Sequence, residues 1–163
     1  MTAFHGTIAL ETKARVSFTD VTERVTDLVA QAALMDGIVL VYSQHTTCSV
    51  MLQEASHDTT YYGTDFLLQD TVHVLEKLIP TATTQGQYLH PGPLHIADAE
   101  QRGEEAWWSL NVDGHLRSLM LGRSVSVPLV RGELILGEFG HIYFADFDQV
   151  RARPRTVHVQ VVG

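Results

Sequence analysis

Hydrophobic positions along the chain recur with two periods, two residues and about 3.6 residues, which are typical of strands and helices. Residues 7–18 alternate apolar and polar side chains, which predicts a pair of half-buried strands. Residues 21–35 instead repeat apolar side chains at helical spacing, behind a capping-box pattern that begins at Asp20 and before a stop at Gly37. The uninterrupted apolar run Ile38–Tyr42 then predicts a central strand buried on both faces.

The middle of the chain combines regular elements with a long irregular stretch. Residues 48–53 alternate as a further strand, and residues 65–78 have the spacing of a second helix, which Pro80 ends because proline donates no helical hydrogen bond. Residues 81–109 have no clean periodicity and include a cluster of acidic side chains. A stretch of this length without regular structure is often functional or mobile.

The last third of the chain has mainly the pattern of strands. A short helix is predicted after Asp113, with Gly122 as its stop and three apolar residues on one face (Leu116, Leu119 and Met120). Alternating apolar residues then predict strands around a turn at Arg131–Gly132 and two more towards the C-terminus (Ile142 and Phe144; Val157, Val159 and Val161). Antiparallel strands around two main helices define an α+β class. We find no linker and expect one domain over residues 1–163.

Composition and net charge limit the kinds of binding partner that we expect for this protein. With 163 residues the chain is long enough for one full core, and its net charge of -8 argues against broad nucleic-acid binding. A local basic pocket for one small phosphate is compatible with that charge. Cys48 is the only cysteine, which favours a reducing cytoplasm. The N-terminus lacks the pattern of a signal peptide, and no apolar run approaches the roughly 20 residues of a membrane span, so no membrane partner is expected.

Histidines supply the main candidates for chemistry. Nine are present, at positions 5, 45, 57, 73, 90, 95, 115, 141 and 158, without an H-E-x-x-H or paired C-x-x-C signature. A metal site would therefore have to be assembled from distant segments. The alternative is that most of these side chains are solvated or make ordinary hydrogen bonds, as we expect for His5, His73 and His158.

Several short motifs are weak signals individually, but the order in which they occur along the chain is a more specific signal. The motif His45-Thr46-Thr47 is followed by an acidic residue at Glu54. Asn111–Ser118 contains the pattern N-x-D-x-H-x-R. Ser124–Asp148 and, more weakly, Tyr88–His90 contain further positions that match a known protein family. In this order, over roughly residues 5–162, they resemble the YjbQ-like family. The resemblance implies an α+β fold with a mostly antiparallel β-sandwich or barrel-like core, assembly as a homotrimer, and secondary thiamine-phosphate synthase activity.

The resemblance also implies a site. His45, His90 and His115 are its candidate metal ligands, and three imidazoles would leave one position open for water or substrate. Zinc is the preferred ion, with magnesium or manganese as alternatives for turnover. Asp113 is a candidate ligand or orienting group, against the alternative of helix capping. Glu54 is a candidate acid or base, against the alternative of a surface carboxylate.

Other residues are candidates for contact with phosphate. Arg117, near the start of a short helix, is the preferred phosphate contact, with a surface ion pair as the alternative. Thr46, Thr47 and Ser49 can donate hydroxyl hydrogen bonds to an oxyanion, or can be ordinary strand residues. Cys48 is expected to be a small buried side chain rather than a nucleophile, because strand alternation separates it from His45.

The implied reaction joins a pyrimidine methyl diphosphate to a thiazole phosphate and releases pyrophosphate. Arginine and helix N–H groups, with a divalent ion, would stabilise the departing negative charge, and the histidines would hold the metal or the phosphate. The chain departs from the family pattern at Phe139–His141, in place of Trp-Gln, at Ala55, and in a longer loop over 95–108. A metal- or anion-binding protein with incidental activity and a metal-dependent phosphohydrolase are the alternatives.

Overall fold

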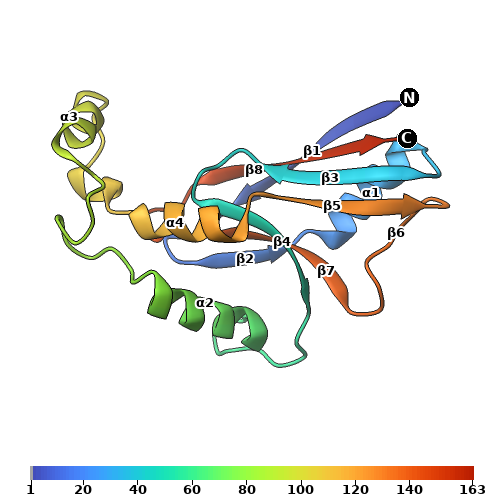
Figure 1. The fold of residues 1–163 in the computed structure, drawn as a ribbon, viewed down its shortest axis with the longest axis horizontal. Helices are drawn as coiled ribbons and strands as arrows, with labels where there is room; N and C mark the ends of the chain where they lie inside the picture. Colours follow the sequence, from blue (N-terminus) through green and yellow to red (C-terminus); the bar gives the residue numbers. More distant parts are fainter. Residues whose placement is uncertain (1) are drawn as a thin grey trace.

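Two antiparallel sheets that curl into a half-barrel, together with four α-helices, make up the described part of the protein (Figure 1). The structure is a computed structural model and describes residues 2–163. In chain order the elements are β1 (Ala3–Glu11), β2 (Ser17–Asp20), α1 (Thr22–Ala32), β3 (Gly37–Ser43), β4 (Cys48–Glu54), α2 (Phe66–Leu78), α3 (Pro93–Gln101), the 3-10 helix η1 (Ala106–Ser109), α4 (Val112–Leu121), β5 (Ser124–Val130), β6 (Glu133–Leu134), β7 (Gly140–Asp146) and β8 (Pro154–Val162).

The strand pairing differs from the sequence prediction at the N-terminus. One sheet has the order β1-β8-β3-β5-β6 and the other has the order β2-β7-β4. The predicted strands within residues 7–18 are present, but β1 pairs with β8 and β2 pairs with β7, so they belong to different sheets. Alternation identifies a strand without identifying its partner. The first sheet also joins the chain ends, because Thr2 and Gly163 exchange two backbone hydrogen bonds.

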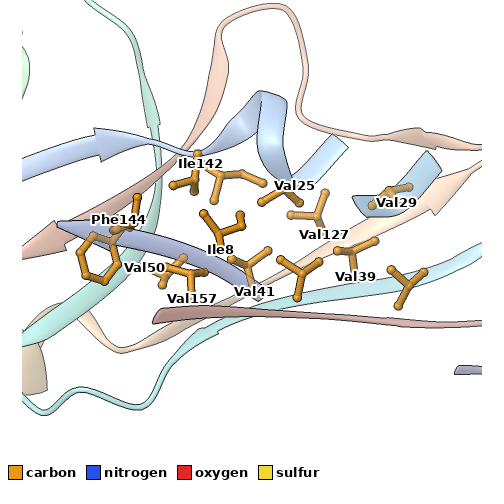
Figure 2. Packing of buried hydrophobic residues seen from close by; sticks show 14 of the residues in the cluster. Ile8, Val25, Val29, Val39, Val41, Val50, Val127, Ile142, Phe144 and Val157 are labelled. Carbon is orange, nitrogen blue, oxygen red and sulfur yellow. The ribbon is translucent and has the colours of Figure 1, made fainter. Parts of the chain in front are cut away.

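Aliphatic side chains fill the space between the sheets and α1. Valines of β3, β5 and β8 point towards Val25 and Val29 of α1, and Phe144 closes one end of the cluster beside Val50 (Figure 2). β-branched residues suit this packing because they are stiff and fit a pleated surface. The resulting core fixes the ends of the strands that carry the polar site.

Strand β3 is central in its sheet, as expected, but the prediction that both of its faces are buried is wrong. Val39 and Val41 are fully buried, whereas Ile38 is 57% and Leu40 38% exposed. The inward face packs on the core, and the outward face is left open to solvent. A continuous apolar run can therefore form a strand of which only one face packs against the rest of its own chain.

The helices fall close to their predicted positions, with one exception. Helix α1 ends earlier than predicted, at Ala33 in the left-handed conformation (φ 53°). Asp65 caps α2 by accepting the N–H groups of Leu67 and Leu68. Helix α3 was not predicted, because its nine residues show no clear apolar face. No helix within residues 2–163 is both long enough and apolar enough to cross a membrane.

Helix α4 turns polar residues inward. Asp113, Arg117 and Ser118 are buried, while Leu119 and Met120 of the predicted apolar face are exposed. The buried polar groups are satisfied in part: Ser118 Oγ donates to the carbonyl of Cys48 and Arg117 Nη2 to the carbonyl of Ile79 at 2.8 Å, whereas Arg117 Nε and Nη1 meet no hydrogen-bond partner within residues 2–163. Hydrogen bonding, rather than apolar burial, therefore orients this helix.

A polar pocket of arginines and histidines

A polar pocket of about 350 Å³ lies where four segments meet. The segments are the β3–β4 turn, the α3–η1 region, the start of α4 and the residues that lead into β8. Its lining consists of Gln44, His45, Thr46, Thr47, His95, Arg102, Glu104, Trp108, Ser109, Asn111, His115, Arg151, Arg153 and Arg155. This lining contains four arginines and one glutamate, so the pocket is basic although the chain as a whole is acidic.

The β3–β4 turn is fixed to strand β8 by His45. Its Nε2 accepts the backbone N–H of Thr156 at 2.9 Å, and Ser43 Oγ accepts the N–H of His45 itself. Because Nε2 is an acceptor, the neutral ring carries its proton on Nδ1. His45 lines the pocket, so this Nδ1–H is the donor that it offers to a ligand.

Three arginines alternate along the segment that enters β8. Residues two apart on an extended chain share a face, so Arg151, Arg153 and Arg155 all line the pocket. Arg155 is held most firmly: its Nε donates to Asp146 Oδ2 at 2.7 Å, and the pair is almost fully buried. Arg153 Nε lies 3.0 Å from Asp148 Oδ2.

Two of these guanidinium groups have donors to spare. The Nε atoms of Arg151 and Arg153 are buried; that of Arg151 meets no hydrogen-bond partner in residues 2–163, and that of Arg153 has only its ionic contact with Asp148 Oδ2. Arg151 stacks on the Trp108 ring at 3.9 Å from its centroid, and its nearest carboxylate oxygen, on Glu104, is 3.8 Å away. Buried donors normally have acceptors, so this arrangement favours an anionic ligand with several oxygen atoms.

Three histidine rings lie together at one side of the pocket. The His90 ring centroid is 4.6 Å from that of His95 and 5.8 Å from that of His115. Burial lowers the pKa of His90 and of His115, and in each case a neighbouring histidine lowers it further. Both rings are therefore held in the neutral form near pH 7.

Some predicted site residues meet in this pocket. His45, Thr46, Thr47 and His115 line it, and His90 contacts the ring of His115. Thr47 also donates to Asp146 Oδ1 at 3.3 Å, so its hydroxyl is partly engaged in the pocket floor.

The other predicted residues lie elsewhere. Arg117 is fully buried, with its guanidinium 3.5 Å from Asp113, and it is not among the residues that line this pocket. Asp113 also accepts from Gln149. Ser49 is buried within β4. Glu54, six residues along β4 from Cys48 and thus about 20 Å away, lines a different pocket with His57 and His141.

Cys48 is part of the core, as the sequence predicted. Its side chain is fully buried against the β-sheet cluster, and burial raises the pKa of its thiol far above the usual range. A thiol held in this neutral form is a poor nucleophile.

The predicted metal trio is not assembled around one point. Within residues 2–163, no three histidine, cysteine, aspartate or glutamate side chains stand in the geometry of ligands to one ion. His45 Nε2 is engaged by Thr156, whereas His90 and His115 lie together. The ring beside them is that of His95, which the sequence did not single out.

Sequence reasoning missed two sources of pocket residues. The R-x-R-x-R spacing of 151–155 is a usable signal, because it places three like charges on one face of an extended segment. Arg102, Glu104 and Trp108 come from the stretch described as irregular, and their spacing carries no comparable signal. Only the expectation that such a stretch is often functional pointed to them.

The His45–Thr156 hydrogen bond leads to a pH prediction. Burial and the charge of Arg155 lower the pKa of His45 below 6.5, so below about pH 6.5 the unfolded chain binds a proton that the folded chain resists. Stability is complete above that pH and is lost as the pH falls towards the folded pKa. We expect His45→Gln to reduce the slope of unfolding free energy against pH below about pH 6.5. Urea unfolding at several pH values measures it; an unchanged slope would contradict the assignment.

The fold and the pocket define a class, a small α+β half-barrel protein with a basic polar pocket at the strand ends. The family model described as "UPF0047 protein YjbQ-like" matches residues 6–163, and the chain belongs to this family. It is 33% identical over 146 residues to a UPF0047 protein of Archaeoglobus fulgidus, covering 90% of this chain and 93% of that protein. A UPF0047 protein of Methanothermobacter thermautotrophicus is 28% identical, covering 100% and 94%.

Solved structures show the same fold. A YbjQ-like protein of unknown function from Sulfolobus solfataricus superposes with a TM-score of 0.76 at 18% identity, covering 99% of this chain and 98% of that one. A yjbq/upf0047 family protein from Clostridium acetobutylicum gives 0.72 at 23% identity, with 96% and 98% covered. At these identities the likeness extends to the fold alone.

Proposed function

We propose that the pocket binds phosphorylated small metabolites and that the protein is a secondary thiamine-phosphate synthase-type transferase. In the proposed reaction, the thiazole ring nitrogen of a thiazole phosphate attacks the methylene carbon of a pyrimidine methyl diphosphate. A C–N bond forms, the C–O bond to the diphosphate breaks, and its electron pair leaves with pyrophosphate. The ring nitrogen carries no proton, so the attack itself needs no general base.

The buried Nε donor of Arg151, which meets no hydrogen-bond partner in the described residues, is the observation that carries this proposal; beside it, Arg153 Nε has only its ionic contact with Asp148. Negative charge grows on the departing diphosphate, and donors already fixed in place stabilise that charge without reorganising. The guanidinium fork suits phosphate oxygens, and Trp108 limits the movement of Arg151 by stacking on it. His45, which lines the same pocket, supplies a neutral donor through its Nδ1–H.

A binding protein without significant turnover is the second candidate. The observation that favours it is the position of the two predicted catalytic carboxylates. Glu54 lines another pocket, and Asp113 is buried against Arg117. The remaining lining carboxylate, Glu104, already makes ionic contacts with Arg102 and Arg151.

A turnover assay separates the two candidates. Purified protein is given both phosphorylated substrates, and thiamine phosphate and pyrophosphate are measured. We expect turnover that saturates with substrate and falls at least about 100-fold in His115→Ala, the loss typical of a residue that stabilises the transition state. Arg24→Gln, an exposed change on α1, is the control and keeps full activity. Absence of thiamine phosphate from the wild-type reaction would rule out the synthase.

We also propose assembly as a homotrimer and a cytoplasmic location, both of which the family resemblance implies. An open apolar groove of about 370 Å³ between α2 and α4 supports the trimer, since Val74, Leu78 and Met120 are all more than half exposed there. Apolar surface of this kind is commonly covered by a partner. Cys48, a free and buried thiol, is compatible with a reducing compartment.

Trimer assembly is tested by mass in solution. Light scattering is expected to give about three times the 18.1 kDa of the chain. Val74→Glu places a charge in the groove and should shift the mass towards that of one chain. Leu94→Glu, on the exposed face of α3, is the control and leaves the mass unchanged. A wild-type protein of single-chain mass would disprove the trimer.

A further inference from the structure

A second cavity, which we call the β2 cavity, lies between strand β2 and the loop that precedes α2 (Figure 1). Its volume of about 530 Å³ is typical of a site for a small molecule. One face of the β2-β7-β4 sheet forms its floor, and the 55–65 loop and the β1–β2 connection form its walls. None of its lining residues belongs to the arginine and histidine pocket, so it is a separate site.

Three oxygen-bearing side chains lie close together in the lining of the β2 cavity. Asp20 and Tyr143 are direct partners in the β2–β7 ladder, so their side chains project from the same face of the sheet. Asp65, the N-cap of α2, lines the cavity as well. Burial raises the pKa of the Tyr143 hydroxyl, and the charges of Asp20 and Asp65 raise it further. Both carboxylates therefore act on the same hydroxyl, which stays protonated and neutral.

The Tyr143 hydroxyl has no partner in the part of the chain that the structure describes. The side chain is only 6% exposed, yet its hydroxyl makes no hydrogen bond to any group in residues 2–163. Buried hydroxyl groups normally have a partner. Because Tyr143 lines the β2 cavity, a ligand bound there can supply the missing one.

The two carboxylates are fixed in position but keep some capacity to accept. Each accepts three hydrogen bonds, Asp20 from the backbone and hydroxyl of Thr22 and from His141, and Asp65 from the N–H groups of Ser56, Leu67 and Leu68. A carboxylate has about four lone-pair sites, so each can accept one more hydrogen bond. With the Tyr143 oxygen, the cavity offers three acceptors.

Two cations line the same cavity without a counter-ion. Lys13 and Arg15 belong to the β1–β2 connection, and the Arg15 guanidinium lies 5.4 Å from the centroid of the Tyr62 ring. Neither cation forms an ion pair with any carboxylate in residues 2–163. Phe18 and Leu68 add apolar surface to the lining. The cavity therefore combines free cations, free acceptors and apolar contact area.

We propose that the β2 cavity binds a small zwitterion of the amino-acid class. Its ammonium group would donate to Asp20, Asp65 and Tyr143, since an ammonium has three donors for these three acceptors. Its carboxylate would bind to Lys13 and Arg15 by charge-assisted hydrogen bonds. A ligand with one charge would leave either the cations or the acceptors unmatched. The proposal goes beyond the proposed function, because the two sites share no residue.

Calorimetric titration with leucine and with ε-aminocaproate tests the proposal. Both are zwitterions, and they differ in how far apart the ammonium and the carboxylate lie. Hexylamine and caproate carry one charge each and are the matched control ligands. We expect one site per chain for at least one zwitterion, with an affinity at least about 10-fold above that for either control ligand, because each charge-assisted hydrogen bond adds about that much.

Two variants identify the site. Arg15→Gln and Tyr143→Phe should each weaken binding of the zwitterion about 10-fold. Tyr143→Phe removes an oxygen that has no protein partner, so the melting temperature should stay nearly unchanged. The control Lys77→Gln, an exposed change near the C-terminal end of α2, should bind as the wild type does.

Wild-type protein that gives no saturable heat with either zwitterion would overturn the proposal, as would Tyr143→Phe protein that binds with wild-type affinity. Hexylamine or caproate that binds as tightly as the zwitterions would also overturn it. Titration of the same variants with inorganic pyrophosphate reports on the arginine and histidine pocket. Failure of the β2 cavity as a site is thus distinguishable from failure of the proposed function.

Discussion

Asp146→Asn is expected to lower the free energy of unfolding by about 3–5 kcal/mol, the usual cost of breaking a buried ion pair from one side. Asp146 is fully buried beneath the pocket. Its Oδ2 accepts from Arg155 Nε at 2.7 Å and from Thr12 Oγ1 at 2.9 Å. Its Oδ1 accepts from Thr47 Oγ1 and from the N–H of Asp148. The amide supplies one acceptor oxygen and no charge, so Arg155 loses its closest counter-ion.

Chemical unfolding by urea measures this change. Asp27→Asn, the same substitution on the exposed face of α1, is the control and should alter stability by less than about 0.5 kcal/mol. Equal effects of the two substitutions would mean that Asp146 does not organise the pocket floor.

Phe144→Ala is expected to destabilise the protein by about 3–5 kcal/mol, as large-to-small changes in a core usually do. Phe144 lies on β7 with no exposed surface, and it closes the end of the aliphatic cluster next to Val50 (Figure 2). Its removal leaves a cavity between the two sheets. Because Asp146 follows two residues later on the same strand, the pocket floor is expected to loosen as well.

Phe139 provides a matched control for this prediction. It is 59% exposed just before β7, so Phe139→Ala removes the same atoms where little is buried. Its effect on thermal unfolding should be small. A Phe144→Ala protein that melts within a degree or two of Phe139→Ala would contradict the packing described for this end of the core.

Local patterns in the sequence were sufficient for most elements. Alternation located the strands, and Asp65 and Pro80 marked the two ends of α2. Pairing was not predictable in the same way, because β1 and β2 are adjacent in sequence yet join different sheets. Helix α4 shows a further limit: its buried face is chosen by hydrogen bonds to Ile79 and Cys48, which no hydrophobic pattern encodes.

The sequence identified pocket residues only where a motif position also lies in the pocket of the folded chain. The H-T-T turn and His115 meet in the pocket because the turn before β4 packs beside α4. The burial of Arg117 was not predictable, because its motif position says nothing about which face of α4 is buried. Arg153 was overlooked because an arginine next to a strand is usually a solvent-exposed residue without a specific function. The burial of its Nε atom beside Asp148 distinguishes it, and this is not visible in a sequence.

Calorimetric titration with inorganic pyrophosphate tests the central claim, that the arginine and histidine pocket is an anion site. The account predicts one binding site per chain, weakened by added salt and at least about 10-fold weaker in Arg153→Gln, since each charge-assisted hydrogen bond contributes about 1.5–3 kcal/mol. Arg24→Gln should bind as the wild type does. Wild-type protein that gives no saturable heat, or Arg153→Gln protein that binds with wild-type affinity, would contradict it.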